Sequence, residues 1–186
     1  MKRLMDVFLG SLALLITSPL FILISIVISA TSRGGVIYWS DRVGKDNLIF
    51  KMPKFRTMMI DTPPVASSAL DEPSRWLTPV GGFLRRNSLD ELPQLWSVIK
   101  GDMSLVGPRP VLAKEDELLS LRTKWGVHTL RPGITGLAQI RGRDFVSITK
   151  KAKIDLEYLQ TKSHFIDLKI IVITLVKVFK REGISH

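Results

Sequence analysis

Residues 7–30 read VFLGSLALLITSPLFILISIVISA, an apolar run close to the start of the chain. The run holds 24 residues without a charged side chain, and 17 of them are apolar. A helix of this length is about 36 Å long, whereas the hydrocarbon core of a bilayer is about 30 Å thick. The run is therefore long enough to span a membrane. It is too long, and lacks a clear cleavage site, for a secretory signal peptide.

A Ser18-Pro19 pair lies in the middle of this run. Proline removes a backbone donor and clashes with the preceding turn, so the helix is expected to kink or break there. The Ser18 hydroxyl is suited to bond a backbone carbonyl that the break releases.

Basic residues lie on both sides of the run. Lys2 and Arg3 precede it, and 25 Lys and Arg against 16 Asp and Glu follow it. The positive-inside rule places both flanks in the cytoplasm. A helix that enters the bilayer, bends at Ser18-Pro19 and leaves by the same face satisfies this rule; a proline-kinked span is the alternative.

The composition excludes several classes of site. Cysteine is absent, which excludes disulfide scaffolds, thiol catalysis and cysteine-ligated zinc. The three histidines are widely spaced, so a histidine-rich metal motif is excluded as well. The net charge of +10 favours an acidic partner, which is nucleic acid, anionic lipid or a phosphorylated substrate.

The remaining sequence predicts a small, mostly helical α+β domain. Short strands at 36–39 and 48–50 flank the turn residues 44–47, which indicates a hairpin. Residues 61–79 hold four of the ten prolines and predict an irregular surface loop. Periodicity and end signals predict helices over 88–99, closed by Gly101, and over 112–124, 150–160 and 165–181.

The last of these helices has an apolar face and a basic end. The apolar face is formed by Leu168, Ile171, Val172, Leu175 and Phe179. Such a face is typical of a core helix. With Lys177, Lys180 and Arg181 at its end, the helix also suits a position in the membrane interface.

Candidate chemistry is concentrated in residues 84–110, LRRNSLDELPQLWSVIKGDMSLVGPRP. Asp90 and Glu91 are adjacent. With Ser88 as N-cap, Glu91 completes a capping box; with Asp90 as N-cap, Pro93 falls in the first turn, where proline is tolerated. Both arrangements place Asp90 in a first helical turn, which favours a bound phosphate. Capping alone is the structural alternative.

Pro108-Arg109-Pro110 holds an arginine on a stiff backbone, because each proline fixes its own φ and Pro110 restricts Arg109. A stiff guanidinium loses little entropy when it grips a phosphate. In isolation the same tripeptide is often a turn with a solvated arginine. Eighteen residues separate Asp90 from Arg109, enough for a helix and a return loop, so the two are able to face each other across a cleft.

Nine short motifs follow one another along the chain. They are Lys2-Arg3 with Asp6, Ser18-Pro19, Arg42-Val43-Gly44, KFRTM at 54–58, SLDELPQL at 88–95, GDMS at 101–104, VGPRP at 106–110, RPGITG at 131–136 and DLKI at 167–170. The chain resembles, over nearly its whole length, the bacterial sugar transferases of the monotopic phosphoglycosyl transferase type, in their minimal small form. It departs from their pattern near Ile148-Thr149, which replaces a tryptophan, and at Gly82, which replaces a basic residue.

The resemblance implies a covalent mechanism. Asp90 would attack the β-phosphate of a UDP-sugar and release UMP, and undecaprenyl phosphate would then take the sugar phosphate from Asp90. Asp90 and Glu91 form the implied catalytic pair, with Glu91 either orienting the metal or accepting a proton. Mg²⁺ is the implied cofactor, with Asp90 as its protein ligand. The implied phosphate-binding residues are Arg85, Arg109, Arg56 and Arg131.

The resemblance also implies an organisation and a location. Residues 1–32 would form the re-entrant membrane helix and residues 33–186 a cytoplasmic catalytic domain at the bacterial inner membrane. The implied partners are a UDP-sugar, undecaprenyl phosphate and membrane lipids, without nucleic acid; a homodimer is left open. The reaction would be the first membrane step of a glycoconjugate pathway. Similar small members take N-acetylated or diacetamido sugars, but no motif reports the sugar.

Two other functions are alternatives to this one. A membrane-tethered, non-catalytic binder of anionic lipid or nucleic acid explains the charge and the anchor, but not residues 88–94 and 108–110. The 14 aromatic residues are scattered, without the stacking platform expected for single strands. A glycosyltransferase on a nucleotide-binding α/β fold requires alternating strands and helices, which the chain does not show.

Overall fold

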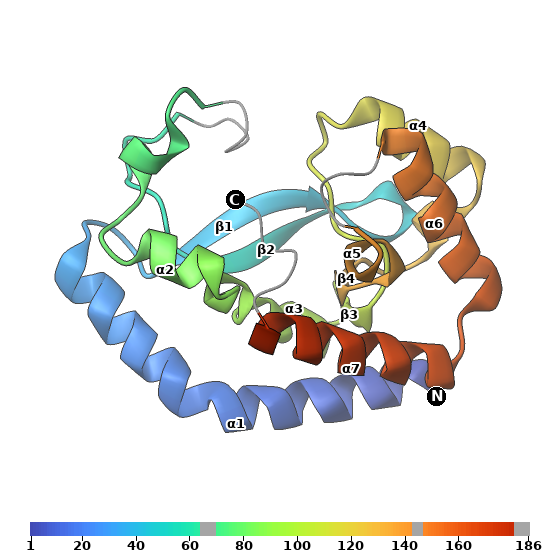
Figure 1. Cartoon of the computed structure of the whole chain (residues 1–186), viewed down its shortest axis with the longest axis horizontal. Coiled ribbons are helices and arrows are strands. Elements are labelled where there is room, and N and C mark those ends of the chain that lie inside the picture. The colour runs from blue at the N-terminus through green and yellow to red at the C-terminus, as the bar shows by residue number, and fades with distance from the viewer. Residues whose placement is uncertain (64–69, 143–146, 181–186) are drawn as a thin grey trace.

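The computed structural model describes residues 1–63, 70–142 and 147–180. One long helix, α1 (Lys2–Thr31), lies along one side of the molecule, and a compact α+β part lies on it (Figure 1). Within the described residues, α1 is the one helix long and apolar enough to cross a membrane. Only 11% of its most apolar window is buried in the protein, so α1 could anchor the chain in a membrane.

Helix α1 is continuous through Pro19, which corrects the expected break. The Ser18 hydroxyl donates to the carbonyl of Leu15 at 2.8 Å. Leu15 lies four residues before Pro19, so its carbonyl is the one that the missing proline N–H leaves without a helical donor. The proposed role of Ser18 is thereby confirmed, and the ribbon of α1 bends without breaking (Figure 1). Re-entrance into a bilayer stays a prediction.

The predicted hairpin is confirmed. Strands β1 (Ile37–Val43) and β2 (Ile49–Phe55) pair antiparallel, joined by a turn with a short 3₁₀ segment, η1 (Lys45–Asn47). Both strands are longer than expected because both faces of the hairpin are packed. Phe55 lies in a cluster with Ile24 and Ile28 of α1, and Met52 lies in another with Val98 and Met103.

A second sheet was not predicted. Strands β3 (Ser104–Val106) and β4 (Gly133–Thr135) pair in parallel. Glycine permits the close approach, since a Cβ on Gly133 would lie 2.1 Å from the Gly107 nitrogen. The glycine-rich segment after Arg131 is thus partly a strand, and it continues into α5 (Leu137–Ile140).

The other helices complete a mostly helical α+β fold, as predicted. They are α2 (Gly81–Arg86), α3 (Gln94–Lys100), α4 (Asp116–Lys124), α6 (Ile148–Thr161) and α7 (His164–Lys180). Gly101 closes α3 with φ of 107°, as expected. The predicted loop at 61–79 contains a 3₁₀ turn, η3 (Pro73–Trp76), and its residues 64–69 lie outside the described part.

The apolar face predicted on the last helix is exposed. Leu168, Val172 and Leu175 are each about half exposed, at 47%, 58% and 54%, whereas Ile170 is buried. Ile171 of the same face packs against a buried cluster, so a core position is confirmed for Ile171 and wrong for the three exposed residues. A membrane-interface position stays a prediction. The side chain of Phe179, and Arg181, lie outside the described residues.

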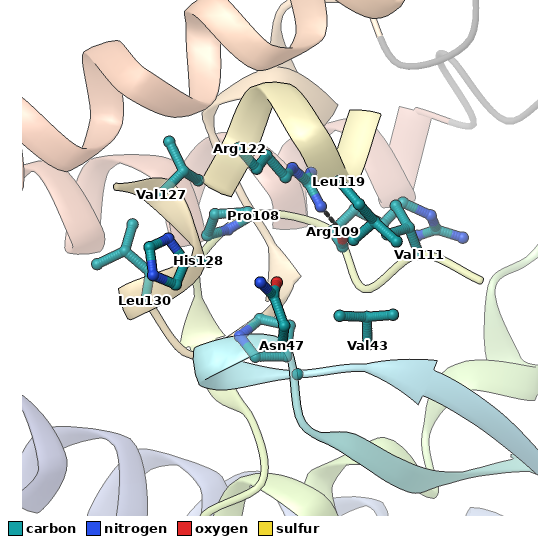
Figure 2. A pocket seen from close by; sticks show the side chains of 12 residues that line it. Val43, Asn47, Pro108, Arg109, Val111, Leu119, Arg122, Val127, His128 and Leu130 are labelled. Carbon is teal, nitrogen blue, oxygen red and sulfur yellow. Dashed lines mark hydrogen bonds between the residues drawn. The ribbon is translucent and has the colours of Figure 1, made fainter. Parts of the chain in front are cut away.

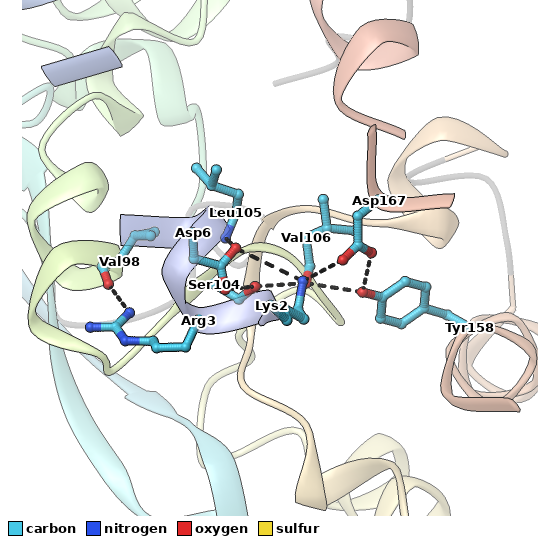
Figure 3. A network of polar contacts seen from close by, with 9 residues as sticks. All are labelled: Lys2, Arg3, Asp6, Val98, Ser104, Leu105, Val106, Tyr158 and Asp167. Carbon is cyan, nitrogen blue, oxygen red and sulfur yellow. Dashed lines mark hydrogen bonds and ion pairs between the residues drawn. The ribbon is translucent and has the colours of Figure 1, made fainter. Parts of the chain in front are cut away.

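A polar network fastens the start of α1 to the domain (Figure 3). Lys2 contacts Asp167 of α7 at 2.7 Å, and the Tyr158 hydroxyl donates to the same carboxylate at 2.6 Å. Buried Asp6 accepts the Ser104 hydroxyl at 2.8 Å. Burial raises the pKa of Tyr158, and the Asp167 carboxylate raises it further.

Arg3 adds a second fastening at the end of α3. Its guanidinium donates to the carbonyls of Val98 and Ile99, which lie in the last turn of that helix. Orphan carbonyls at a helix end are thereby satisfied. Lys2, Arg3 and Asp6 were known from the sequence only as a motif, and their role in the structure is to seat α1 on the domain.

Candidate active site

Asp90 and Glu91 lie on a short 3₁₀ turn, η4 (Leu89–Glu91), between α2 and α3. The expected capping box does not form, because Ser88 adopts φ of 54° and its side chain makes no capping bond. Helix α3 begins only at Gln94, after Pro93. The prediction that Asp90 lies in the first turn of an 88–99 helix is therefore wrong; Asp90 precedes α3 on a separate turn.

The two carboxylates share one lysine. Asp90 is 6% exposed, and its Oδ2 lies 3.8 Å from Lys54 Nζ. Glu91 Oε1 accepts from the same Nζ at 2.9 Å and from Arg109 Nη2 at 3.1 Å. Arg109 was expected to face Asp90 across a cleft, and the structure pairs it with the adjacent Glu91.

Sequence reasoning missed Lys54 as a site residue. It was quoted only within the KFRTM motif, because its distance from Asp90 depends on how β2 packs against η4. The signal available was its hairpin position, opposite Tyr38 and next to buried Phe55. With 19% of its side chain exposed, Lys54 is well placed to neutralise anions at this site.

Arg85 faces the pair from α2. Its Nε donates to the Thr57 hydroxyl at 3.0 Å, which fixes the guanidinium. Burial lowers the pKa of Arg85, and the negative charge of Asp90 partly opposes this effect. Arg85 therefore lies within electrostatic reach of Asp90, where a phosphate-binding residue is needed.

The other two predicted arginines make their recorded contacts elsewhere. Arg56 Nε donates to the Gly35 carbonyl at 2.6 Å, at the base of the hairpin. Arg131 Nε donates to the Gly101 carbonyl at 2.8 Å. Gly101 follows the C-terminal end of α3, whereas Asp90 precedes the N-terminal end. Neither contact brings a guanidinium to the carboxylate pair. Both arginines instead satisfy backbone carbonyls.

The backbone of Arg109 is held by Arg122, a member of a buried ion pair; Figure 2 shows the hydrogen bond from Arg122 to the Arg109 carbonyl. Arg122 Nη1 donates to the Arg109 carbonyl at 2.9 Å, and Arg122 Nη2 meets Asp155 Oδ2 at 2.7 Å. Burial raises the pKa of Asp155, although the contact with Arg122 lowers it. Burial of the Arg122–Asp155 pair thus carries a large desolvation free energy. The clearest structural role of the pair is to hold the Arg109 backbone.

Two hollows border the site. The pocket in Figure 2, beside Arg109, has a volume of about 20 Å³, room for one water molecule. A larger apolar groove, of about 360 Å³, lies between α1, the hairpin and the start of α3. Pro93, three residues from Asp90, lines this groove together with Trp96, Trp39 and the Ser18 turn of α1.

The site offers few metal ligands. Within the described residues there is no group of three or more His, Cys, Asp or Glu side chains able to hold a metal ion. Mg²⁺ needs only one or two carboxylates when substrate phosphates supply further oxygens. Glu91 Oε1 is engaged by two cations. Asp90, whose Oδ2 lies farther from Lys54 Nζ than Glu91 Oε1 does, at 3.8 Å against 2.9 Å, is the carboxylate that fits such an ion best.

Comparisons with known proteins identify the family and several relatives of this chain. A family model described as bacterial sugar transferase matches residues 1–181. The exopolysaccharide production protein ExoY of Rhizobium meliloti is 40% identical, over 98% of this chain and 87% of its own length. EpsL of Bacillus subtilis, an uncharacterized sugar transferase, is 40% identical over all of this chain and 91% of its own length.

A third relative is named for a defined reaction. The UDP-glucose:undecaprenyl-phosphate glucose-1-phosphate transferase of Escherichia coli is 38% identical over 96% of this chain. The present chain spans 40% of the length of that relative.

Proposed function

This chain belongs to the bacterial sugar transferase family, and from that premise we propose that it moves a sugar 1-phosphate from a UDP-sugar to undecaprenyl phosphate. The observation that carries the proposal is the environment of Asp90. This carboxylate is nearly buried, lies 3.8 Å from Lys54, and is followed three residues later in the chain by Pro93, which lines an apolar groove. A carboxylate among cations beside an apolar surface suits a phosphate transfer to a lipid.

The first displacement takes place at the β-phosphorus of the UDP-sugar. An Asp90 carboxylate oxygen forms a bond to this phosphorus, and the bond to the oxygen that bridges the two phosphates breaks. UMP leaves with that oxygen and its electron pair. The sugar phosphate remains on Asp90 as a mixed anhydride, so this is nucleophilic catalysis.

The second displacement releases the enzyme. A phosphate oxygen of undecaprenyl phosphate attacks the same phosphorus, and the Asp90 carboxylate departs. The product is a sugar linked to the lipid by a diphosphate. Each step breaks one phosphorus–oxygen bond and forms another, so no oxidant or reductant is required.

Charge neutralisation is the main demand on the protein. A carboxylate that approaches a phosphate at 4 Å repels it by about 4 kcal/mol per pair of unit charges at an effective dielectric constant of 20. Lys54, Arg85 and Arg109 would offset this repulsion. Glu91 holds Lys54 and Arg109 in place, at 2.9 and 3.1 Å, and we assign it this positioning role. Mg²⁺, held by Asp90 and phosphate oxygens, would supply further positive charge.

The groove and α1 suit the lipid acceptor. The apolar lining of the groove fits the isoprenoid chain of undecaprenyl phosphate, whose phosphate would then lie near Asp90. Both ends of α1 contact the domain, through Lys2 with Asp167 and through Ile28 with Phe55. A straight span would carry the first of these ends across the membrane. This supports a monotopic protein on the cytoplasmic face of the inner membrane.

A labelled donor tests the proposed function. The full chain in nanodiscs is given a panel of UDP-sugars, each with radiolabelled sugar, together with Mg²⁺ and undecaprenyl phosphate. With the correct sugar, UMP is released and the label moves into a lipid diphosphate. A panel without any UMP release or lipid label would refute the proposal. The comparisons give no support to a non-catalytic binder.

Arg109→Lys tests the phosphate grip. The substitution keeps the positive charge but removes the planar fork. Charge-assisted hydrogen bonds contribute about 1.5–3 kcal/mol each, so turnover is expected to fall by about 10- to 100-fold. Steady-state UMP release measures this fall. Lys51→Gln, on the exposed side of the hairpin, is the matched control, and unchanged turnover of Arg109→Lys would remove Arg109 from the site.

Single cysteines test the topology, since the natural chain contains none. A cysteine inserted after Met1 and another at exposed Asp41 should both react only with a reagent on the cytoplasmic side. Replacement of both Ser18 and Pro19 by leucine should shift the first cysteine toward the opposite face, because the run is long enough to cross. Labelling of the first position from the opposite face in the natural sequence contradicts the re-entrant path.

A further inference from the structure

Arg42 lies beside Arg109 although no site role was expected for it. Arg42 is on β1, and its Nε donates to the hydroxyl of buried Ser40 at 3.0 Å. Burial lowers the pKa of Arg42, and the positive charge of Arg109 lowers it further. Glu115, Tyr38 and Glu91 oppose these effects, each less strongly than Arg109 acts. Arg42 therefore lies within electrostatic reach of Arg109 and of the carboxylates of Glu115 and Glu91.

The two arginines come from separate parts of the chain that are clamped together. The Val43 N–H, next to Arg42, donates to the Val111 carbonyl at 2.9 Å. Arg122 holds the Arg109 carbonyl at 2.9 Å on the other side. A phosphate bound between the two guanidinium groups would offset the mutual repulsion that remains while Glu91 pairs with Arg109 at 3.1 Å. Because the backbones of Arg42 and Arg109 are already fixed, binding of such an anion would cost little conformational entropy.

The position of Arg42 fits one particular anion. Arg42 and Lys54 lie on the same face of the hairpin, since Tyr38 pairs with Lys54 and Arg42 follows four residues later on β1. This offset is about 13 Å along the strand, and Arg109 meets Glu91, the partner of Lys54, at 3.1 Å. In a phosphoryl transfer the leaving oxygen lies opposite the nucleophile. The leaving nucleotide would thus extend from Asp90 past Arg109 toward Arg42.

We infer that Arg42, together with Arg109, binds the α-phosphate of the UDP-sugar, the group that departs as the phosphate of UMP. The inference rests on the proposed function, which it deepens by placing the leaving group. Ser40 takes the Nε hydrogen, so the Nη nitrogens are the donors suited to the phosphate. The pocket behind Arg109, at about 20 Å³, is too small for a pyrimidine ring. We therefore expect substitution of Arg42 to weaken the binding of the phosphate group and not of the base.

Binding of UMP to the full chain in nanodiscs tests this inference without turnover. Isothermal titration with UMP and with ribose 5-phosphate is compared between the natural protein and Arg42→Gln. Loss of a charge-assisted, forked contact should weaken both ligands by about 10- to 100-fold. Lys51→Gln is the matched control, a hairpin cation paired with exposed Asp41, and should bind UMP as the natural protein does.

A second variant keeps the test decisive if Arg42→Gln does not fold. Arg42→Lys retains the charge and should weaken UMP by about 5- to 10-fold through loss of the fork. Unchanged UMP affinity in a folded Arg42 variant would overturn the inference, and so would a natural protein that does not bind UMP. Neither result would contradict the proposed function, which UDP-sugar turnover tests separately. If UMP binding depends on Arg42 but the protein turns over no UDP-sugar, the proposed function alone is contradicted.

Discussion

Asp90→Asn should abolish UMP release. The substitution keeps the size of the side chain and removes the charge that makes it a nucleophile. Loss of the nucleophile should slow overall turnover by at least about 1000-fold, which is about 4 kcal/mol of activation free energy. The measurement is single-turnover UMP release with the correct UDP-sugar and Mg²⁺. Asp41→Asn, an exposed carboxylate of the hairpin, is the control and should keep its activity.

Glu91→Gln separates the two members of the carboxylate pair. Its amide oxygen still accepts hydrogen bonds, but it no longer carries the charge that holds Lys54 and Arg109. UMP release should therefore be slowed, yet the covalent adduct should still form. A complete loss of adduct in both Asp90→Asn and Glu91→Gln would mean that Glu91 takes a direct part in the first displacement.

Asp155→Ala should cause the largest loss of stability. The substitution leaves the Arg122 guanidinium buried without its carboxylate, and breaking such a pair costs about 3–5 kcal/mol. In a chain of this size the melting temperature should fall by at least about 6 °C. Glu157→Gln is the matched control, because its ion pair with Arg141 is exposed on both sides and contributes at most about 1 kcal/mol.

The combined substitution of Arg122→Met with Asp155→Leu separates stability from activity. Replacing a buried ion pair by apolar side chains is often neutral or stabilising, so the melting temperature should recover. The Arg109 carbonyl, however, loses its donor. UMP release should then stay reduced by about 10-fold, the effect of one misplaced charge-assisted contact. Full recovery of both properties would show that the pair does not position Arg109.

Local signals predicted much of the architecture. The apolar run, the hairpin turn at 44–47 and the Gly101 helix end each depend on residues close in sequence, and all three are observed. The break at Pro19 was wrong because a neighbouring hydroxyl compensates for the missing donor. The start of the 88–99 helix was wrong, because Ser88 adopts a left-handed conformation and α3 begins only after Pro93.

The parts that were missed depend on tertiary contacts. Strands β3 and β4 have three residues each, too short for a periodic signal, and they pair across 26 residues of intervening chain. Lys54 and Arg42 are ordinary strand cations until the hairpin is packed against η4 and the Arg109 loop. Arg56 and Arg131 belong to motifs of the family, yet their recorded contacts are with backbone carbonyls that no local pattern identifies.

The central claim is a covalent intermediate on Asp90, and the intact mass of the protein tests it most directly. The natural protein is mixed with Mg²⁺ and the UDP-sugar that supports turnover, without any polyprenol phosphate, and its mass is then measured. A covalent route predicts a gain of one sugar phosphate, with UMP released in an amount bounded by the enzyme present. An unmodified mass, together with UMP that appears only after undecaprenyl phosphate is added, would contradict it.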